Sequence, residues 1–121
     1  MPKPSALIVA RDPMTGALIG SLVEVSGFRP LFPLPTEDTA HAIARLRPDV
    51  VLVDCDAGDE ARCVEPVSEY GGSVILFSPW RTEPELRSIA SRLGLGYFTL
   101  PIHWLEFRRQ LRRASGQVED R

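Results

Sequence analysis

Asp54 is the acidic residue of this sequence best placed to belong to a functional site. It ends the run 49–54, whose four middle residues are apolar and mostly β-branched. A strand that is apolar on both faces is typical of the centre of a parallel sheet, between two layers of helices. Such sheets hold their sites at the carboxyl ends of the strands. The plainer alternative is that the carboxylate caps a helix or pairs with an arginine. Asp56, two residues later, is expected to be a loop acid in solvent.

Ser78 follows a second apolar run, 74–77, in the same way. Its hydroxyl is therefore expected at the same edge of the sheet as Asp54, although it can also simply cap the turn into Pro79 and Trp80. The turn after the first apolar run, residues 10–13, lacks the glycines that cradle phosphates. This argues against a nucleotide site at that turn.

The residue types that commonly bind metals are scattered. Cys55 and Cys63 lack the paired spacing of a metal site, so two reduced thiols are expected. His41 and His103 are single residues on predicted helices and are expected at the surface. The residues themselves therefore point to no metal site.

Five short apolar runs predict five strands that alternate with helices. The predicted strands are 6–10, 28–33, 49–54, 74–77 and 97–100. The predicted helices are 13–26, 36–47, 83–93 and 103–114. A further short helix is expected within 57–70, where Pro66 interrupts any long helix, one option being that it covers only the second half. Pro30 and Pro33 cannot donate ladder hydrogen bonds, which confines the second strand to an edge of the sheet.

Capping residues mark several of the helix boundaries. Asp12 before Pro13 is typical of an N-cap, Thr82 with Glu85 has the pattern of a capping box, and glycine closes two helices. The first helix is expected to bury Leu18, Leu22 and Val25, with Ile19 and Val23 beside them, and the second to bury Ala40, Ile43 and Ala44.

The alternation of strands and helices predicts an α/β fold. We expect a doubly wound five-stranded parallel sheet in the order 2-1-3-4-5, with helices on both faces. At 121 residues the chain is long enough for one domain with a full core. The core is expected at about 5–114 and a tail at 115–121.

The overall charge excludes some classes of partner. The formal net charge is −2, and the arginines of the last predicted helix are expected to form a solvated face, so general nucleic-acid binding is not predicted. There is no apolar run of about 20 residues, so no membrane span is predicted, and we expect a cytoplasmic protein.

Together these features resemble the receiver domains of bacterial two-component response regulators, over residues 6–114. The resemblance rests on the strand that ends in a single Asp at 54 and on the strand that ends in a hydroxyl at 78. It also rests on residues 94–101, Gly-Leu-Gly-Tyr-Phe-Thr-Leu-Pro, which look like the family's Gly-x-x-Gly-Tyr followed by Lys-Pro. The resemblance implies that Asp54 is at the phosphoacceptor position. It implies that Ser78 bonds the phosphoryl group and that Tyr97 is the aromatic residue that changes rotamer on activation.

Three positions depart from the family's pattern. Ala10 and Arg11 stand where the family has two acids that hold magnesium, and Leu100 stands where it has a lysine. Lys3 is the only lysine, so no other lysine can substitute. Phosphoryl transfer depends on positioning and charge stabilisation, so we expect weak or absent magnesium binding, no cofactor, and a pseudo-receiver.

The resemblance implies a signalling module rather than an enzyme, one that acts through protein–protein contacts independently of phosphorylation. Its partner would be a histidine kinase, an output protein or a second copy of the chain. The family docks through its fourth helix, fifth strand and fifth helix, which here would present Arg87, Arg92, Tyr97, Trp104, Arg108 and Arg109. Two alternatives stay open: a conventional receiver phosphorylated at Asp54, and a flavodoxin-like domain that binds a small ligand at the carboxyl ends of its strands.

Two further expectations concern this edge of the sheet. The Arg11 guanidinium is expected to pair with Asp54 in place of a metal ion, the alternative being that it turns to solvent while backbone amides cap the carboxylate. The resemblance also implies a cis peptide bond between Leu100 and Pro101.

Overall fold

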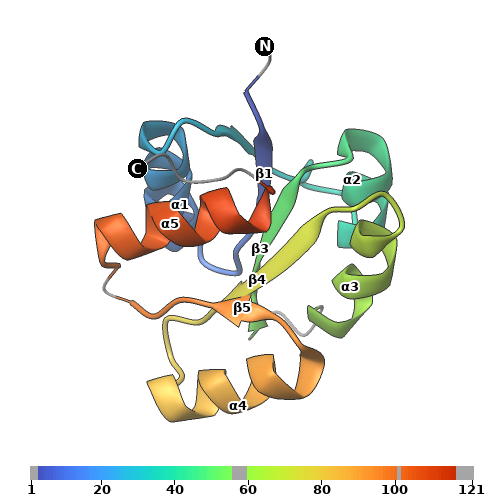
Figure 1. Ribbon diagram of the computed structural model, residues 1–121. Coiled ribbons are helices and arrows are strands. Elements are labelled where there is room, and N and C mark those ends of the chain that lie inside the picture. The colour runs from blue at the N-terminus through green and yellow to red at the C-terminus, as the bar shows by residue number, and fades with distance from the viewer. Residues whose placement is uncertain (1–2, 56–59, 101, 117–121) are drawn as a thin grey trace.

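The computed structural model describes residues 3–55, 60–100 and 102–116. Five strands and five helices alternate along the described chain (Figure 1). The strands are β1 (Ser5–Val9), β2 (Arg29–Leu31), β3 (Val50–Asp54), β4 (Ser73–Phe77) and β5 (Gly96–Tyr97). The helices are α1 (Pro13–Val25), α2 (Thr39–Leu46), α3 (Glu60–Ser68), α4 (Glu83–Leu93) and α5 (Trp104–Ala114).

All strand pairs are parallel, and the strand order is β2-β1-β3-β4-β5. This confirms the predicted α/β class, the doubly wound sheet and the order 2-1-3-4-5. Pro30 lies in β2, at an edge of the sheet as predicted. The core strands β1 and β3 are buried along their whole length, which explains their uninterrupted apolar sequence.

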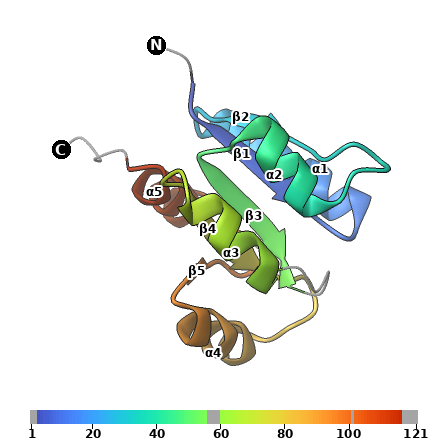
Figure 2. The ribbon, with the colours of Figure 1, turned by 90° about the vertical axis from the view of Figure 1, so that its right-hand side faces the viewer.

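Two hydrophobic clusters cover the two faces of the sheet. Figures 1 and 2 show α1 and α5 over one face and α2 and α3 over the other. On the first face, Ile19 and Val23 of α1 pack with Phe107 and Leu111 of α5. Alternate strand residues such as Leu7 and Val51 point to the other cluster, which includes residues of α2, α3 and α4.

The predicted faces of two helices are only partly right: Ile19, Val23 and Ile43 are buried as predicted, but other residues of these faces are not. In α1 the buried residues are Gly16, Ile19, Gly20 and Val23, whereas Leu18 and Val25 are exposed and Leu22 is only partly buried. In α2 the buried residues are Ala42 and Ile43, whereas Ala40 and Ala44 are exposed. The N-cap of α2 is Asp38, so this helix begins three residues later than predicted.

The cause of the first error is close packing at two glycines. A Cβ atom added at Gly16 would lie 3.2 Å from the Cβ of Ala10, and one at Gly20 would lie 2.8 Å from Cζ of Phe32. The face of α1 that has the smallest side chains therefore lies closest to its neighbours. The larger apolar side chains of the helix point outward instead.

The predicted ends of β2 and β5 are also wrong. The ladder of β2 covers three residues, and that of β5 covers two. Phe98 still donates its backbone N–H to the carbonyl of Leu76, but the chain then leaves the sheet on its way to α5. Ser115 and Gly116 form a turn after α5, and the rest of the predicted tail lies outside the described residues.

Capping residues hold the helix ends as predicted. The Asp12 carboxylate accepts the backbone N–H of Thr15, and Gly94 ends α4 with a left-handed φ of 71°. At the start of α4, Thr82 and Glu85 form a reciprocal capping box. The Glu85 carboxylate accepts the backbone N–H of Thr82 at 2.9 Å, and the Thr82 hydroxyl accepts the N–H of Glu85 at 3.4 Å.

Thr82→Ala is expected to lower the free energy of unfolding by about 1 kcal/mol, because it removes the hydroxyl that accepts an orphan N–H of α4. Urea unfolding measures this change. Thr82→Ser keeps the hydroxyl and is the matched control, expected to behave like the wild-type chain. Equal stability of the alanine and serine variants would contradict the contribution assigned to the cap.

Candidate functional site at the carboxyl ends of β1, β3 and β4

Asp54 lies at the carboxyl end of β3 and is only 1% exposed. It pairs in register with Phe77 of β4 and follows Val53, whose partner in β1 is Val9. Its Oδ2 accepts the backbone N–H of Arg11 at 3.3 Å. A backbone amide therefore helps to solvate the buried carboxylate, as the capping alternative predicts. A contribution of the Arg11 guanidinium to the charge balance at Asp54 stays a prediction.

Ser78 is buried at the same edge of the sheet, one residue after the register partner of Asp54. Its Oγ accepts the backbone N–H groups of Trp80 and Arg81, both at 3.1 Å. The hydroxyl thus caps the turn that leads into α4, as the plainer alternative predicts. The topology brings Asp54 and Ser78 to neighbouring strand ends, as the sequence predicted.

Ala10 and Leu100, two of the three departing positions, are packing residues. Both are partly buried and pack against the hydrophobic cluster under α1 and α5. The Ala10 methyl group lies in the tight contact with Gly16 described above, next to the strand end that carries Asp54. Arg11, by contrast, is exposed. Of the three positions that depart from the receiver pattern, Ala10 and Leu100 therefore pack against the apolar core.

The described residues contain no group of three or more histidine, cysteine, aspartate or glutamate side chains that could hold a metal ion. Asp56 lies outside the described residues, as does the side chain of Cys63, while Cys55 is buried. The peptide bond before Pro101 also lies outside them. His41 is exposed and contacts Asp38 in the first turn of α2, and His103 is exposed at the N-cap of α5, which confirms their predicted surface positions.

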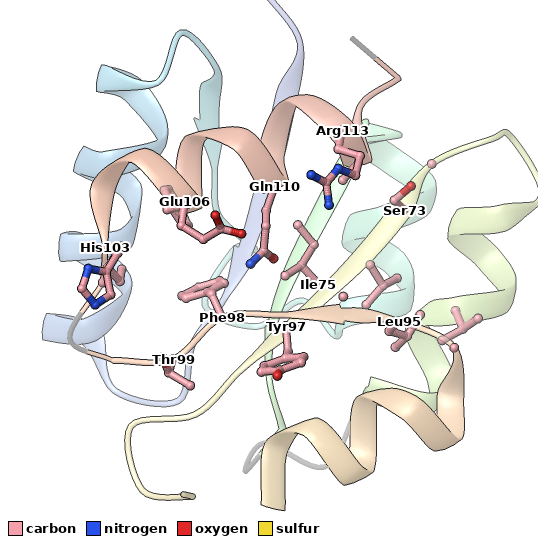
Figure 3. Close-up of a pocket in the computed structure, with 18 of the residues that line it drawn as sticks. Ser73, Ile75, Leu95, Tyr97, Phe98, Thr99, His103, Glu106, Gln110 and Arg113 are labelled. Atoms are coloured by element: carbon pink, nitrogen blue, oxygen red, sulfur yellow. The ribbon is translucent and has the colours of Figure 1, made fainter. Parts of the chain in front are cut away.

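Tyr97 points toward α4. Figure 3 shows its ring on the α4 side of β5. The Tyr97 hydroxyl donates a hydrogen bond to the Glu83 carboxylate, and this bond raises the pKa of Tyr97. Arg87 forms an ion pair with the same carboxylate, with 3.1 Å between Nη2 and Oε1. Glu83 therefore joins two residues of the predicted docking face.

A groove of about 750 Å³ extends along β5 between α4 and α5 (Figure 3). Its floor includes Ile75, Phe98 and Phe107, and one wall is formed by side chains of α5. Those wall residues are spaced three or four positions apart on one side of the helix: His103, Glu106, Gln110 and Arg113. Asp54 and Ser78 do not line the groove, so it is a separate feature from the strand-end site.

The sequence prediction of the docking face missed this wall. Of the predicted face residues only Tyr97 lines the groove. Arg109 pairs with Glu106 at 3.3 Å, and Nε of Arg108 is buried without a hydrogen-bond partner among the described residues. The wall could have been predicted from the sequence. The apolar residues Phe107 and Leu111 mark the buried side of α5, and the wall residues lie next to them on the helix.

No protein-family model matches the chain, and no curated protein matches it in sequence. Solved structures do match. A response regulator receiver protein from Burkholderia phymatum is 22% identical, with a TM-score of 0.75 over 98% of this chain and 100% of that one. The receiver domain of a sensor histidine kinase from Pseudomonas aeruginosa, whose structure has a magnesium ion in its active-site cleft, is 21% identical with a TM-score of 0.71. That match covers 96% of this chain and 100% of the other.

A putative response regulator from Chloroflexus aurantiacus is 12% identical, with a TM-score of 0.75 over 96% of this chain and 100% of that one. The fold of the chain is therefore a doubly wound, flavodoxin-like α/β fold. Within that class it is the fold of the response-regulator receiver domain, which confirms the resemblance noted from the sequence. None of the described helices is long and apolar enough to cross a membrane.

Proposed function

We propose that this chain is a receiver-like signalling module that acts through protein–protein contacts and is not switched by phosphorylation of Asp54. The receiver fold supports a signal-transduction module. The observation that carries the rest is the packing of Ala10, next to the strand end with the buried Asp54, and of Leu100 against the hydrophobic core. Two positions that a phosphoryl-transfer site would fill with charge are apolar and serve stability instead.

The electrostatic argument follows from this packing. An aspartyl phosphate would carry about 1.5 to 2 negative charges in place of the single charge of a carboxylate that is nearly fully buried. Magnesium requires near-octahedral oxygen ligands and is usually held by one or two carboxylates together with phosphate and water. Among Ala10, Arg11 and Leu100, no side chain offers an oxygen ligand, and only Arg11 carries a positive charge. The phosphorylated state would therefore lack most of the stabilisation that the chemistry requires.

The proposed partner surface is the α4–β5–α5 face, defined here by Glu83, Arg87, Tyr97, Glu106, Gln110 and Arg113. The groove gives this face an apolar floor, and the charged residues of both helices give it a polar rim. An apolar centre within a polar rim is the usual anatomy of a protein interface. Glu83 joins Tyr97 and Arg87 on the α4 side of this face, and these contacts form without any ligand at Asp54.

Incubation with acetyl phosphate and millimolar magnesium tests the phosphorylation part of the proposal. We expect no stoichiometric labelling of the wild-type chain on a phosphate-affinity gel, and the same pattern for Asp54→Asn. Robust labelling that disappears in Asp54→Asn would instead establish a conventional receiver. A receiver domain with an intact acidic pair and lysine, run in parallel, confirms that the assay detects aspartyl phosphate.

A further inference from the structure

The outer side of α1 carries apolar side chains where a surface helix normally carries polar ones. Met14 is 82% exposed, Leu18 55% and Val25 69%. With 3.6 residues per turn, these three side chains lie on the side of α1 opposite the buried residues Ile19 and Val23. Exposed apolar residues that gather on one helix face mark a contact site more often than scattered ones do.

The spacing of this face is that of a helix–helix contact. Met14, Leu18, Ser21 and Val25 are separated by four, three and four residues, which is the alternation of core positions in paired helices. These four residues are called the α1 seam below. A seam with this spacing fits a second helix that lies nearly parallel or antiparallel to α1.

Ser21, the one polar residue of the seam, already has a hydrogen-bond partner within its own helix. The hydroxyl of Ser21 donates to the carbonyl of Ala17 at 3.1 Å, one turn earlier in the same helix. Burial of the seam would therefore leave the serine hydroxyl with a hydrogen-bond partner, so the usual cost of burying a polar group is avoided. The small side chains of Ala17 and Ser21 also allow a neighbouring helix to come close.

The charge distribution identifies the partner that this face fits. Glu24 is the only charged residue among the thirteen of α1, and it lies outside the seam. The exposed sides of the other helices with described side chains carry charge, for example Arg45 of α2, Arg87 of α4 and Arg109 of α5. Interface centres are depleted of charge, so the surface that best complements the seam is an equally uncharged helix.

We propose that the α1 seam is a self-association surface on which a second copy of this chain packs its own α1. Two copies can meet about a two-fold axis, because the same uncharged seam serves both sides without like-charge repulsion. The centre of the seam falls between Leu18 and Ser21, so these residues lie nearest the axis. The contact involves one short helix from each copy, and the dimer is therefore weak and concentration-dependent. It is independent of the α4–β5–α5 face.

Sedimentation equilibrium over a series of concentrations tests this proposal. The wild-type chain is expected to show a monomer–dimer equilibrium, and Leu18→Glu is expected to weaken the dimer at least about tenfold, which corresponds to about 1.4 kcal/mol. Ala44→Glu adds the same charge at an exposed position of α2, on the opposite face of the sheet, and should leave the dimer unchanged. Thermal unfolding should confirm that both variants fold.

Cross-linking gives a second measurement. In a chain with Cys63→Ser, Ser21→Cys is expected to form a disulfide-linked dimer under mild oxidation, whereas Ala44→Cys is expected to stay monomeric. A wild-type chain that is monomeric at every concentration would overturn the proposal. So would a dimer that is insensitive to Leu18→Glu, which would assign self-association to another surface such as the α4–β5–α5 face.

Discussion

Phe107→Ala is expected to lower the free energy of unfolding by about 3–5 kcal/mol, because it leaves a large cavity beneath α5. Phe107 is 2% exposed and, with Leu111, is one of the two buried residues of its helix. Its ring contacts Phe98 edge to face, with 5.0 Å between centroids, and Phe98 stacks on Phe77 at 5.3 Å. Such aromatic pairs contribute about 0.5–1.5 kcal/mol beyond the area they bury.

Domains of this size have a total stability of about 5–15 kcal/mol, so this one substitution removes a large share of it. Chemical denaturation measures the loss. Leu105→Ala, at a leucine of the same helix that is 68% exposed, is the matched control and should have a much smaller effect. A loss at Phe107 no greater than the loss at Leu105 would show that α5 is not held by this aromatic cluster.

The same cluster links stability to the proposed partner surface. Phe98 and Phe107 form part of the floor of the groove, and α5 forms its wall. In the Phe107→Ala variant, amide hydrogen exchange of α5 should therefore accelerate more than that of β3. Since the strand-end residues Asp54 and Ser78 do not line the groove, the two sites can be perturbed separately.

The sheet could be predicted from the sequence because its strands are short apolar runs with clear ends. The runs that became β1, β3 and β4 are buried on both faces, so no choice of face was needed. β5 was predicted to be too long because Phe98 and Leu100 are apolar for another reason: they pack beneath α5 after the ladder has ended. Apolar sequence alone does not distinguish a strand from a buried connection.

The orientation of α1 could not be predicted because the helix is apolar on two sides. Its sequence contains one charged residue, so hydrophobic periodicity favours neither face. The apolar stripe predicted from the sequence included Leu18 and Val25 among the buried residues, but the close approach of Ala10 and Phe32 requires glycine on the inner side. These contacts come from the segments just before and after α1, and they are visible only once those segments are packed against the helix. The outward seam is a consequence of that packing.

The residues of the candidate site could be predicted from the sequence, but the contacts that they make could not. The positions of Asp54 and Ser78 follow from the strand ends, and the departures at Ala10, Arg11 and Leu100 follow from the resemblance. That Ala10 and Leu100 are partly buried in the core became visible only in three dimensions. Their packing implies that restoring a charged residue at either position removes apolar contacts as well as adding charge.

The combined variant Ala10→Asp, Arg11→Asp and Leu100→Lys is expected to gain magnesium binding, which is expected to be weak or absent in the wild-type chain. It places two carboxylates beside Asp54, which is the donor set that the hard Mg²⁺ ion prefers. Without metal, the three clustered carboxylates repel one another, so the variant should unfold at a lower temperature than the wild-type chain. Magnesium relieves this repulsion, and at about ten times the dissociation constant it stabilises the folded state by about 1.4 kcal/mol.

Thermal unfolding with and without magnesium measures the gain, and the same titration of the wild-type chain should show no shift. Leu100→Gln in place of Leu100→Lys removes the same apolar contacts without adding charge, so it separates the packing cost from the electrostatic effect. Acetyl phosphate labelling should appear in the combined variant and be lost when Asp54→Asn is added. If the combined variant binds magnesium no better than the wild-type chain, then Ala10, Arg11 and Leu100 are not what disables the site, and the basis of the pseudo-receiver proposal fails.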